Sequence, residues 1–147
     1  MIAVRMAGAD DIARLADIFR AASWSNVGDR PLLEQHPEFL EWSGDPAREG
    51  RTLLAELDGD VVGFASTIEL DGVVEVEDLF VDPAAMRRGV ATALIDAVVE
   101  RAAENGAACV AVDANEHALD FYTSAGFVVE GEVALDHGVA LRMSRRW

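Results

Sequence analysis

The sequence contains no lysine. All twelve basic residues are arginines, against 27 acidic residues, so the formal net charge is −15 at pH 7. The absence of lysine excludes a Schiff-base lysine and a phosphate-loop lysine as functional groups. The negative charge argues against nucleic acid and anionic membranes as partners, because both would repel the protein.

Cysteine and long apolar runs are also scarce. Cys109 is the only cysteine, which excludes a disulfide framework and a cysteine metal site. It lies in the apolar run 107–112, so we expect a small core residue rather than a nucleophile. No apolar run approaches the ~18 residues of a membrane span, and residues 1–11 lack the basic and apolar regions of a signal peptide. We therefore expect one cytoplasmic domain over residues 1–147.

Metal and dinucleotide signatures are missing. His36, His117 and His137 are scattered through expected loops and turns without metal-ligand spacing, so we assign no metal. A dinucleotide fingerprint needs three glycines in the pattern Gly-x-Gly-x-x-Gly after a strand, and only Gly89 is available. A dinucleotide-binding enzyme is rejected on this ground.

The hydrophobic periodicity predicts an α+β fold on a mixed sheet. Alternating or continuous apolar runs between turn signals predict strands at 2–6, 51–57, 61–70, 73–81, 107–113, 127–135 and 139–145. Helical spacing predicts helices at about 10–22, 88–105 and 116–125, with a short amphipathic piece at 32–42. The irregular, aromatic-bearing stretch 23–50 is typical of a binding loop.

The rest of the chain is organised around the passage from strand to helix at residues 79–95. Pro83 ends the strand, and apolar residues fall at helical spacing from Val90 onward. No Ser, Thr, Asp or Asn stands before this helix in Met86–Gly89 to cap its first N–H groups. Free N–H donors, the helix dipole, two arginines and a glycine together describe a phosphate seat. On these residues alone, a solvated basic first turn remains an equal alternative.

Two motifs resemble those of the GNAT acetyltransferase superfamily. Val-x-Pro followed by Arg87-Arg88-Gly89-Val90-Ala91 resembles its acyl-CoA-binding motif, and Asn115 to Phe127 is similar to its Asn-x-x-Ala-x-x-Phe-Tyr-x-x-x-Gly-Phe signature. The pattern departs at Met86, where the superfamily has Arg or Gln. The resemblance implies a mixed, mostly antiparallel seven-stranded sheet flanked by about four helices, and an N-acetyltransferase that uses acetyl-CoA.

The resemblance also implies site residues. In the superfamily this strand is bulged, and the apolar run at its end is consistent with an extra residue there. The strand backbone pairs with pantetheine, and one of its N–H groups faces the thioester carbonyl. The implied cofactor-binding residues are Leu79, Phe80, Val81, Met86, Arg87, Arg88, Gly89, Val90, Ala91, Thr92, Asn115 and Tyr122.

Three residues are candidates for proton transfer. Glu77 is the first choice and Glu75 the second for the base that deprotonates the acceptor amine, and Tyr122, the only tyrosine, is the acid that protonates the leaving sulfur. Without the resemblance, both glutamates read as a solvated sheet face, Tyr122 as core packing, and Asn115 as a helix cap.

The acceptor is constrained only by charge. Residues 61–83 hold six acidic side chains and no arginine, an acidic wall that favours a small cationic amine, although a general solubility role is equally common. The alternatives left open are a protein N-terminus or side chain as acceptor, and a non-catalytic acyl-CoA-binding module. A homodimer is left open as the assembly.

Overall fold

The computed structural model describes residues 1–136 and 138–147. His137, which the sequence analysis left without a metal, lies outside the described residues. The described chain divides into two compact units. The first unit comprises residues 1–66 and 78–94, and the second comprises residues 67–77 and 95–147. Each is described below by itself.

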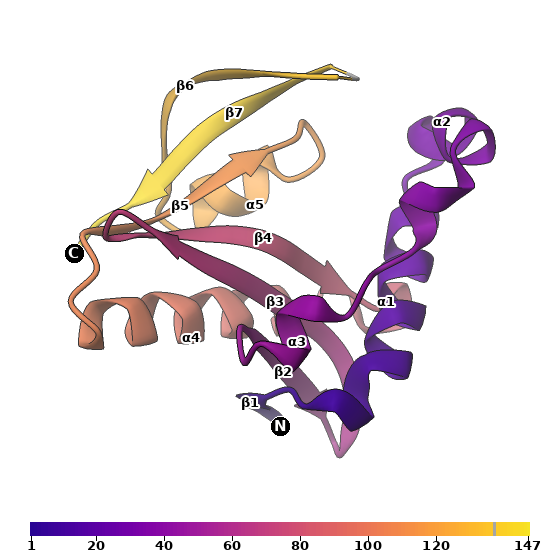
Figure 1. Ribbon diagram of the computed structural model, residues 1–147, viewed down its shortest axis with the longest axis horizontal. Coiled ribbons are helices and arrows are strands. Elements are labelled where there is room, and N and C mark those ends of the chain that lie inside the picture. Colours follow the sequence, from indigo (N-terminus) through magenta and orange to yellow (C-terminus); the bar gives the residue numbers. More distant parts are fainter. Residues whose placement is uncertain (137) are drawn as a thin grey trace. The chain divides into compact units, whose positions relative to one another are not determined.

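The strands form one seven-stranded sheet in the order β1-β2-β3-β4-β5-β7-β6 (Figure 1). β4 and β5 are parallel. The pairings β1–β2, β2–β3, β5–β7 and β6–β7 are antiparallel. The α+β prediction with a mixed, mostly antiparallel sheet is thus confirmed. The strands are β1 (Ile2–Met6), β2 (Thr52–Leu57), β3 (Asp60–Leu70), β4 (Val73–Val81), β5 (Cys109–Ala114), β6 (Val128–Leu135) and β7 (Gly138–Arg145).

The described residues also form five α-helices, against about four expected, together with four 3₁₀ turns. The additional helix is the four-residue α3. The α-helices are α1 (Ile12–Ser25), α2 (Arg30–Gln35), α3 (Asp45–Arg48), α4 (Val90–Glu104) and α5 (Leu119–Ser124). The 3₁₀ turns are η1 (Ala9–Asp11), η2 (Val27–Asp29), η3 (Pro37–Leu40) and η4 (Pro83–Ala85).

The first unit is built on a hairpin that the sequence predicts. β2 and β3 are joined at Asp58 and Gly59, whose φ angles are 52° and 91°. Two successive residues with positive φ match the twist of the flanking strands, which is why Asp-Gly is favoured at such turns. One face of the hairpin is covered by α1, whose Leu15 and Ile18 are fully buried in a cluster with Phe64 of β3.

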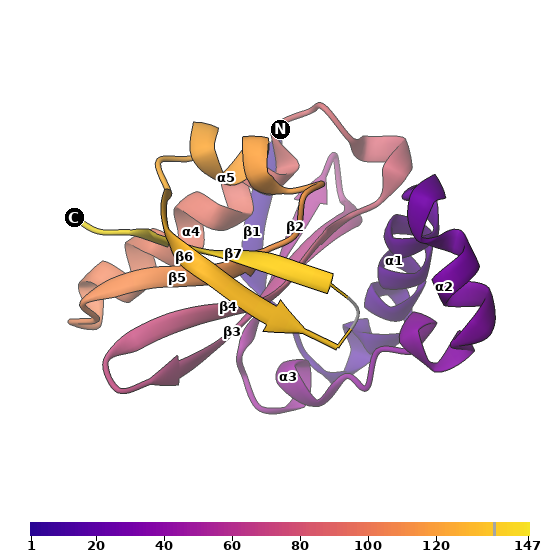
Figure 2. The same ribbon diagram turned by 90° about the horizontal axis from the view of Figure 1, so that it is seen from above.

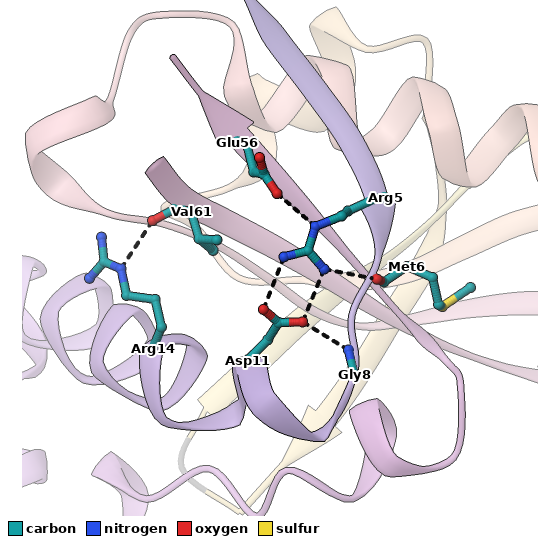
Figure 3. Close-up of polar contacts among 7 residues, drawn as sticks. All are labelled: Arg5, Met6, Gly8, Asp11, Arg14, Glu56 and Val61. Carbon is teal, nitrogen blue, oxygen red and sulfur yellow. Dashed lines mark hydrogen bonds and ion pairs between the residues drawn. The ribbon is translucent and has the colours of Figure 1, made fainter. Parts of the chain in front are cut away.

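A polar network holds the start of the chain to β2 and to η1, the turn before α1 (Figure 3). The Arg5 guanidinium donates to Glu56 at 2.6 Å and to both carboxylate oxygens of Asp11 at 3.0 Å. Asp11 also accepts from the Gly8 backbone N–H at 2.9 Å. The Arg5 hydrogen bonds, and then the Gly8 bond, lower the pKa of Asp11, while Asp11 raises the pKa of Arg5.

The stretch 23–50 is a series of short helices rather than an irregular loop, and α2 and η3 match the amphipathic piece expected at 32–42. The binding role expected of this stretch stays a prediction. α1 runs on to Ser25, and α2, η3 and α3 follow. η3 contacts α1, and α2 lies beside α1 (Figure 2). Pro31, Pro37 and Pro46 stand in the first turns of these three elements. Proline presets φ for a helix and lacks an N–H that would be unpaired there, so these prolines start helices rather than interrupt them.

The second unit contains β5, β6, β7 and α5. Val73–Val76 of β4 pair with β5, which pairs on its other side with β7. β6 forms the edge and is mostly exposed. The core of the second unit includes Val110 and Met143, which are both fully buried. It also includes Cys109, which is 3% exposed, as predicted for a core residue.

Candidate functional site

The candidate phosphate seat is an exposed loop between β4 and α4 in the first unit. Asp82 caps the preceding turn η4 by accepting from the Ala84 backbone N–H at 3.0 Å. Arg87 and Gly89 then both take left-handed conformations, with φ of 64° and 82°. Turns that combine right- and left-handed residues can point successive backbone N–H groups into a concavity that binds anions. An arginine in this region is uncommon, and its conformation is a feature that the sequence did not predict.

Arg14 of α1 fixes the base of this loop. Its Nη2 donates to Asp82 Oδ2 at 2.8 Å and its Nε to the Val61 carbonyl at 3.0 Å (the Val61 bond is drawn in Figure 3). The Arg14 bond, and then the Ala84 bond, lower the pKa of Asp82. A cavity of about 590 Å³ beside them is lined by Arg14, Asp82 and Arg88, among others. The loop therefore follows an anchored turn and borders an open polar cavity.

The second half of β4 carries the strand backbone that the resemblance assigns to the cofactor. Val73–Val76 of β4 pair with β5, whereas β4 itself continues to Val81. Leu79–Val81 are half-buried. A Cβ on Gly63 of β3 would lie 3.0 Å from the Phe80 carbonyl oxygen and 3.0 Å from Val90 Cγ1. Only glycine therefore fits at residue 63 without displacing this strand or the start of α4. The predicted bulge in β4 stays a prediction.

The two candidate bases, both in the second unit, have different surroundings. Glu75 is half-buried and accepts from both terminal nitrogens of Arg142, at 2.6 Å from Nη1 and in a shorter contact from Nη2. Arg142 Nη1 also donates to Asp113 at 3.2 Å. The bond to Glu75 is the chief reason that the pKa of Arg142 is raised. Glu77 is exposed. Glu75 is thus tied into an ion-pair cluster on β4, β5 and β7.

Tyr122 and Asn115 also lie in the second unit. Tyr122 is 4% exposed, and its ring stands edge-on to Phe121 and Phe127 at centroid distances of 5.1 and 5.2 Å. Burial raises the pKa of its hydroxyl. Asn115 Oδ1 accepts from the Ala118 N–H at 3.1 Å, so its side chain caps the turn that precedes α5.

Three side chains with contacts around these candidates were not predicted from the sequence. Arg142 and Asp113 face each other in the β5–β7 ladder and join at Glu75. Trp42, in the connection between η3 and α3, donates to Asp78 of β4 at 3.1 Å. Strand register and the path of the short helices bring these residues to their partners, and neither is visible in local sequence patterns. The glutamates of β4 and the arginine of β7 are the one signal that could have indicated the first cluster, although β5 separates these two strands.

Neither a metal-binding cluster nor a membrane-spanning helix occurs in the part of the chain that the structure describes. Over residues 1–136 and 138–147, no group of three or more His, Cys, Asp and Glu side chains is placed to hold a metal ion. Within the same ranges, no helix has the length and apolar character needed to cross a membrane.

The fold is that of the N-acetyltransferases. A GCN5-related N-acetyltransferase from Rhodopseudomonas palustris has a TM-score of 0.79 at 29% identity, over 99% of this chain and 95% of that one. The PaiA N-acetyltransferase from Thermoplasma acidophilum, solved in complex with coenzyme A, has a TM-score of 0.75 at 17% identity, over 100% and 99% of the two chains. At that identity the second likeness shows the fold alone.

The family follows from the sequence match. The model described as the Acetyltransferase (GNAT) family matches residues 15–127. The chain belongs to this family, as the two motifs predicted. An uncharacterized N-acetyltransferase of Methanocaldococcus jannaschii is 36% identical over 99 residues, which are 60% of this chain and 43% of that protein. This chain therefore aligns with less than half the length of that relative.

Proposed function

We propose that the protein transfers the acetyl group of acetyl-CoA to a primary amine. The observation that carries this proposal is the turn before α4, where Arg87 and Gly89 are left-handed in a chain of the GNAT family. Backbone N–H groups of this turn and of the start of α4 would hold the pyrophosphate. Backbone groups of Leu79–Val81 would hold the pantetheine arm, and one of their N–H groups would stabilise the negative charge on the thioester oxygen.

The proposed chemistry is direct attack of the amine nitrogen on the thioester carbonyl carbon, without a covalent intermediate on the protein. Glu77 takes a proton from the ammonium, directly or through water, so that nitrogen gains a free electron pair. The C–N bond forms as the C–S bond breaks, and Tyr122 gives its hydroxyl proton to the departing sulfur. The second proton that nitrogen loses on becoming an amide is returned to Tyr122 through water, and the proton on Glu77 is released to solvent. The Tyr122 hydroxyl carries its proton at neutral pH, because the ordinary pKa of tyrosine is about 10 and burial raises it further. Arg142 engages both oxygens of Glu75, so that carboxylate is less available as a proton acceptor.

We further propose a small cationic amine as the acceptor. The acidic residues of 61–83 support it, since a negative field concentrates cations. A protein N-terminus or side chain is the competing acceptor. A non-catalytic acyl-CoA-binding module is the competing class, and the presence of Glu77 and Tyr122 argues against it.

The test is a comparison of two glycine variants. Gly89→Asp places an anion and a side chain in the proposed phosphate seat. Gly50→Asp is the matched control, because Gly50 is also left-handed, with φ of 74°, and has open space around it. Strain and added charge are therefore similar in the two variants.

We expect calorimetric titration to show coenzyme A affinity lost in Gly89→Asp and kept in Gly50→Asp and the wild type. Acetyl-CoA-dependent thiol release with a panel of amines should follow the same order. Equal coenzyme A affinity in the two variants would place the pyrophosphate elsewhere. Coenzyme A binding without thiol release for any amine, peptide N-terminus or lysine side chain would favour the binding module.

A further inference from the structure

A cavity lies on the face of α1 that points away from the core of the first unit. Leu15 and Ile18 are fully buried on the inner face of the helix, whereas Asp17 and Arg20 are exposed. Residues 17, 20, 21 and 24 share this outer face, because positions three, four and seven apart lie above one another on a helix. The cavity has a volume of about 450 Å³, within the range of small-molecule pockets. It is lined by Asp17, Arg20, Ala21 and Trp24 of α1 and by Leu40 of η3.

The apolar part of the lining contains an indole ring that is held in place. Ala21, Trp24 and Leu40 supply this part. Arg30 Nε donates to the Trp24 carbonyl at 2.9 Å, and the Arg30 guanidinium stands over the indole at 5.0 Å from the ring centroid. Trp24 is half-buried, so part of its surface is accessible. A second aromatic ring suits such a lining, because aromatic pairs attract each other beyond the burial of their apolar area.

An ion pair forms the charged part of the lining. Arg20 Nη1 lies 3.6 Å from Asp17 Oδ1, which is too far for a hydrogen bond, and the two side chains are 55% and 66% exposed. Exposed pairs of this kind contribute little to stability, so exchanging the pair for contacts with a ligand costs little. A ligand with a single charge would meet a like charge beside its partner. A ligand that carries both charges would find a partner for each.

We propose that this cavity binds a free α-amino acid with an aromatic side chain. Asp17 accepts from its ammonium, Arg20 donates to its carboxylate, and its ring lies against Ala21, Trp24 and Leu40. An α-amino acid carries its two charges on one carbon, which matches two partner groups only 3.6 Å apart. The site goes beyond the proposed acetyl transfer, because no bond forms or breaks there and binding requires no coenzyme A.

The first experiment compares four probes by calorimetry on the full chain, in the absence of acetyl-CoA. L-Phenylalanine has both charges and the ring. 2-Phenylethylamine lacks the carboxylate, 3-phenylpropanoate lacks the ammonium, and L-alanine lacks the ring. We expect each of these three to bind about tenfold or more weakly than L-phenylalanine, because each loses a charged contact or the burial of the ring.

The second experiment locates the binding with variants. Asp17→Asn should weaken L-phenylalanine about tenfold or more and change 3-phenylpropanoate, which has no ammonium, less than about twofold. Ala21→Phe fills the cavity with a ring of the protein and should abolish the binding of L-phenylalanine. Asp45→Asn is the matched control, because Asp45 pairs with Arg48 three positions later on α3 and the two side chains are 68% and 55% exposed. The control should change L-phenylalanine binding less than about twofold, and urea unfolding checks that every variant is folded.

Four results would overturn the proposal: no saturable binding of L-phenylalanine by the wild type, equal affinity for a probe that lacks one of its groups, full affinity in Ala21→Phe, or equal losses in Asp17→Asn and Asp45→Asn. Arg20→Gln tests the other half of the pair should Asp17→Asn be unstable. That variant should weaken L-phenylalanine about tenfold or more and spare 2-phenylethylamine, and equal effects on the two probes would overturn the proposal as well. Since none of these measurements involves turnover, each outcome leaves the proposed acetyl transfer to its own test.

Discussion

Gly63→Ala tests the close approach of β3 to the proposed cofactor strand. The added methyl group would sit 3.0 Å from the Phe80 carbonyl oxygen, 3.0 Å from Val90 Cγ1 and 3.4 Å from Leu94 Cδ1. Two of these distances are a few tenths of an ångström below ordinary contact, and one of them involves backbone, which cannot rotate away. The strand at Phe80, the first turn of α4, or both must therefore shift.

The magnitude follows from the cost of overpacking. Forcing an extra methyl group into a filled core costs about 1–3 kcal/mol. In a protein of this size each kcal/mol lowers the melting temperature by about 2–4 °C. Because the displaced groups are the strand and helix start that we assign to coenzyme A, we also expect its affinity to fall about tenfold or more, a shift of ~1.4 kcal/mol.

The assay is urea unfolding together with calorimetric titration of coenzyme A. Gly131→Ala is the control, because Gly131 lies in β6 and has open space where a Cβ would be. That variant should be unchanged within about 0.5 kcal/mol. If Gly63→Ala matched Gly131→Ala in both measurements, β3 would not approach Phe80 closely and the reasoning would fail. Lost stability with unchanged coenzyme A affinity would refute only the assignment of the cofactor to this strand.

Two further predictions concern proton transfer. Glu77→Gln should lower kcat by ~10²-fold or more and abolish the acidic limb of the pH–rate profile. Glu75→Gln breaks the pair with Arg142, so it should lower stability but retain that limb. Loss of the acidic limb in Glu75→Gln alone would give the role of base to Glu75. Tyr122→Phe keeps the ring contacts with Phe121 and Phe127, so the free energy of unfolding should change little. The loss of the hydroxyl should lower kcat by ~10²-fold. An unchanged kcat would mean that Tyr122 is a packing residue only.

Features set by neighbouring residues could be predicted from the sequence. The turn at Asp58 and Gly59 depends on two residues that tolerate positive φ, and the strand end at Pro83 depends on the proline ring. The helix predicted at 116–125 begins only at Leu119, because the Asn115 side chain caps a turn before it. Family membership likewise followed from two motifs that are local in sequence.

Features set by strand register and packing could not be predicted. The contact between Glu75 and Arg142 joins residues 67 positions apart, and it exists because β5 lies between β4 and β7. The contact between Trp42 and Asp78 depends on the path of three short helices, which proline and glycine made look like a loop. Arg87 has a left-handed conformation that arginine does not favour, so the residue type at this position gives no signal of it.

The burial of Cys109 has a practical consequence for assaying the proposed activity. It is the only thiol in the chain and is 3% exposed, on a strand paired along both edges. A thiol-specific chromophore in the assay mixture will therefore report the coenzyme A that is released and almost nothing from the folded protein. Any slow additional signal, of one equivalent per chain, measures how often β5 separates from its neighbours. One reagent thus follows both the release of coenzyme A and the opening of the sheet in the same cuvette.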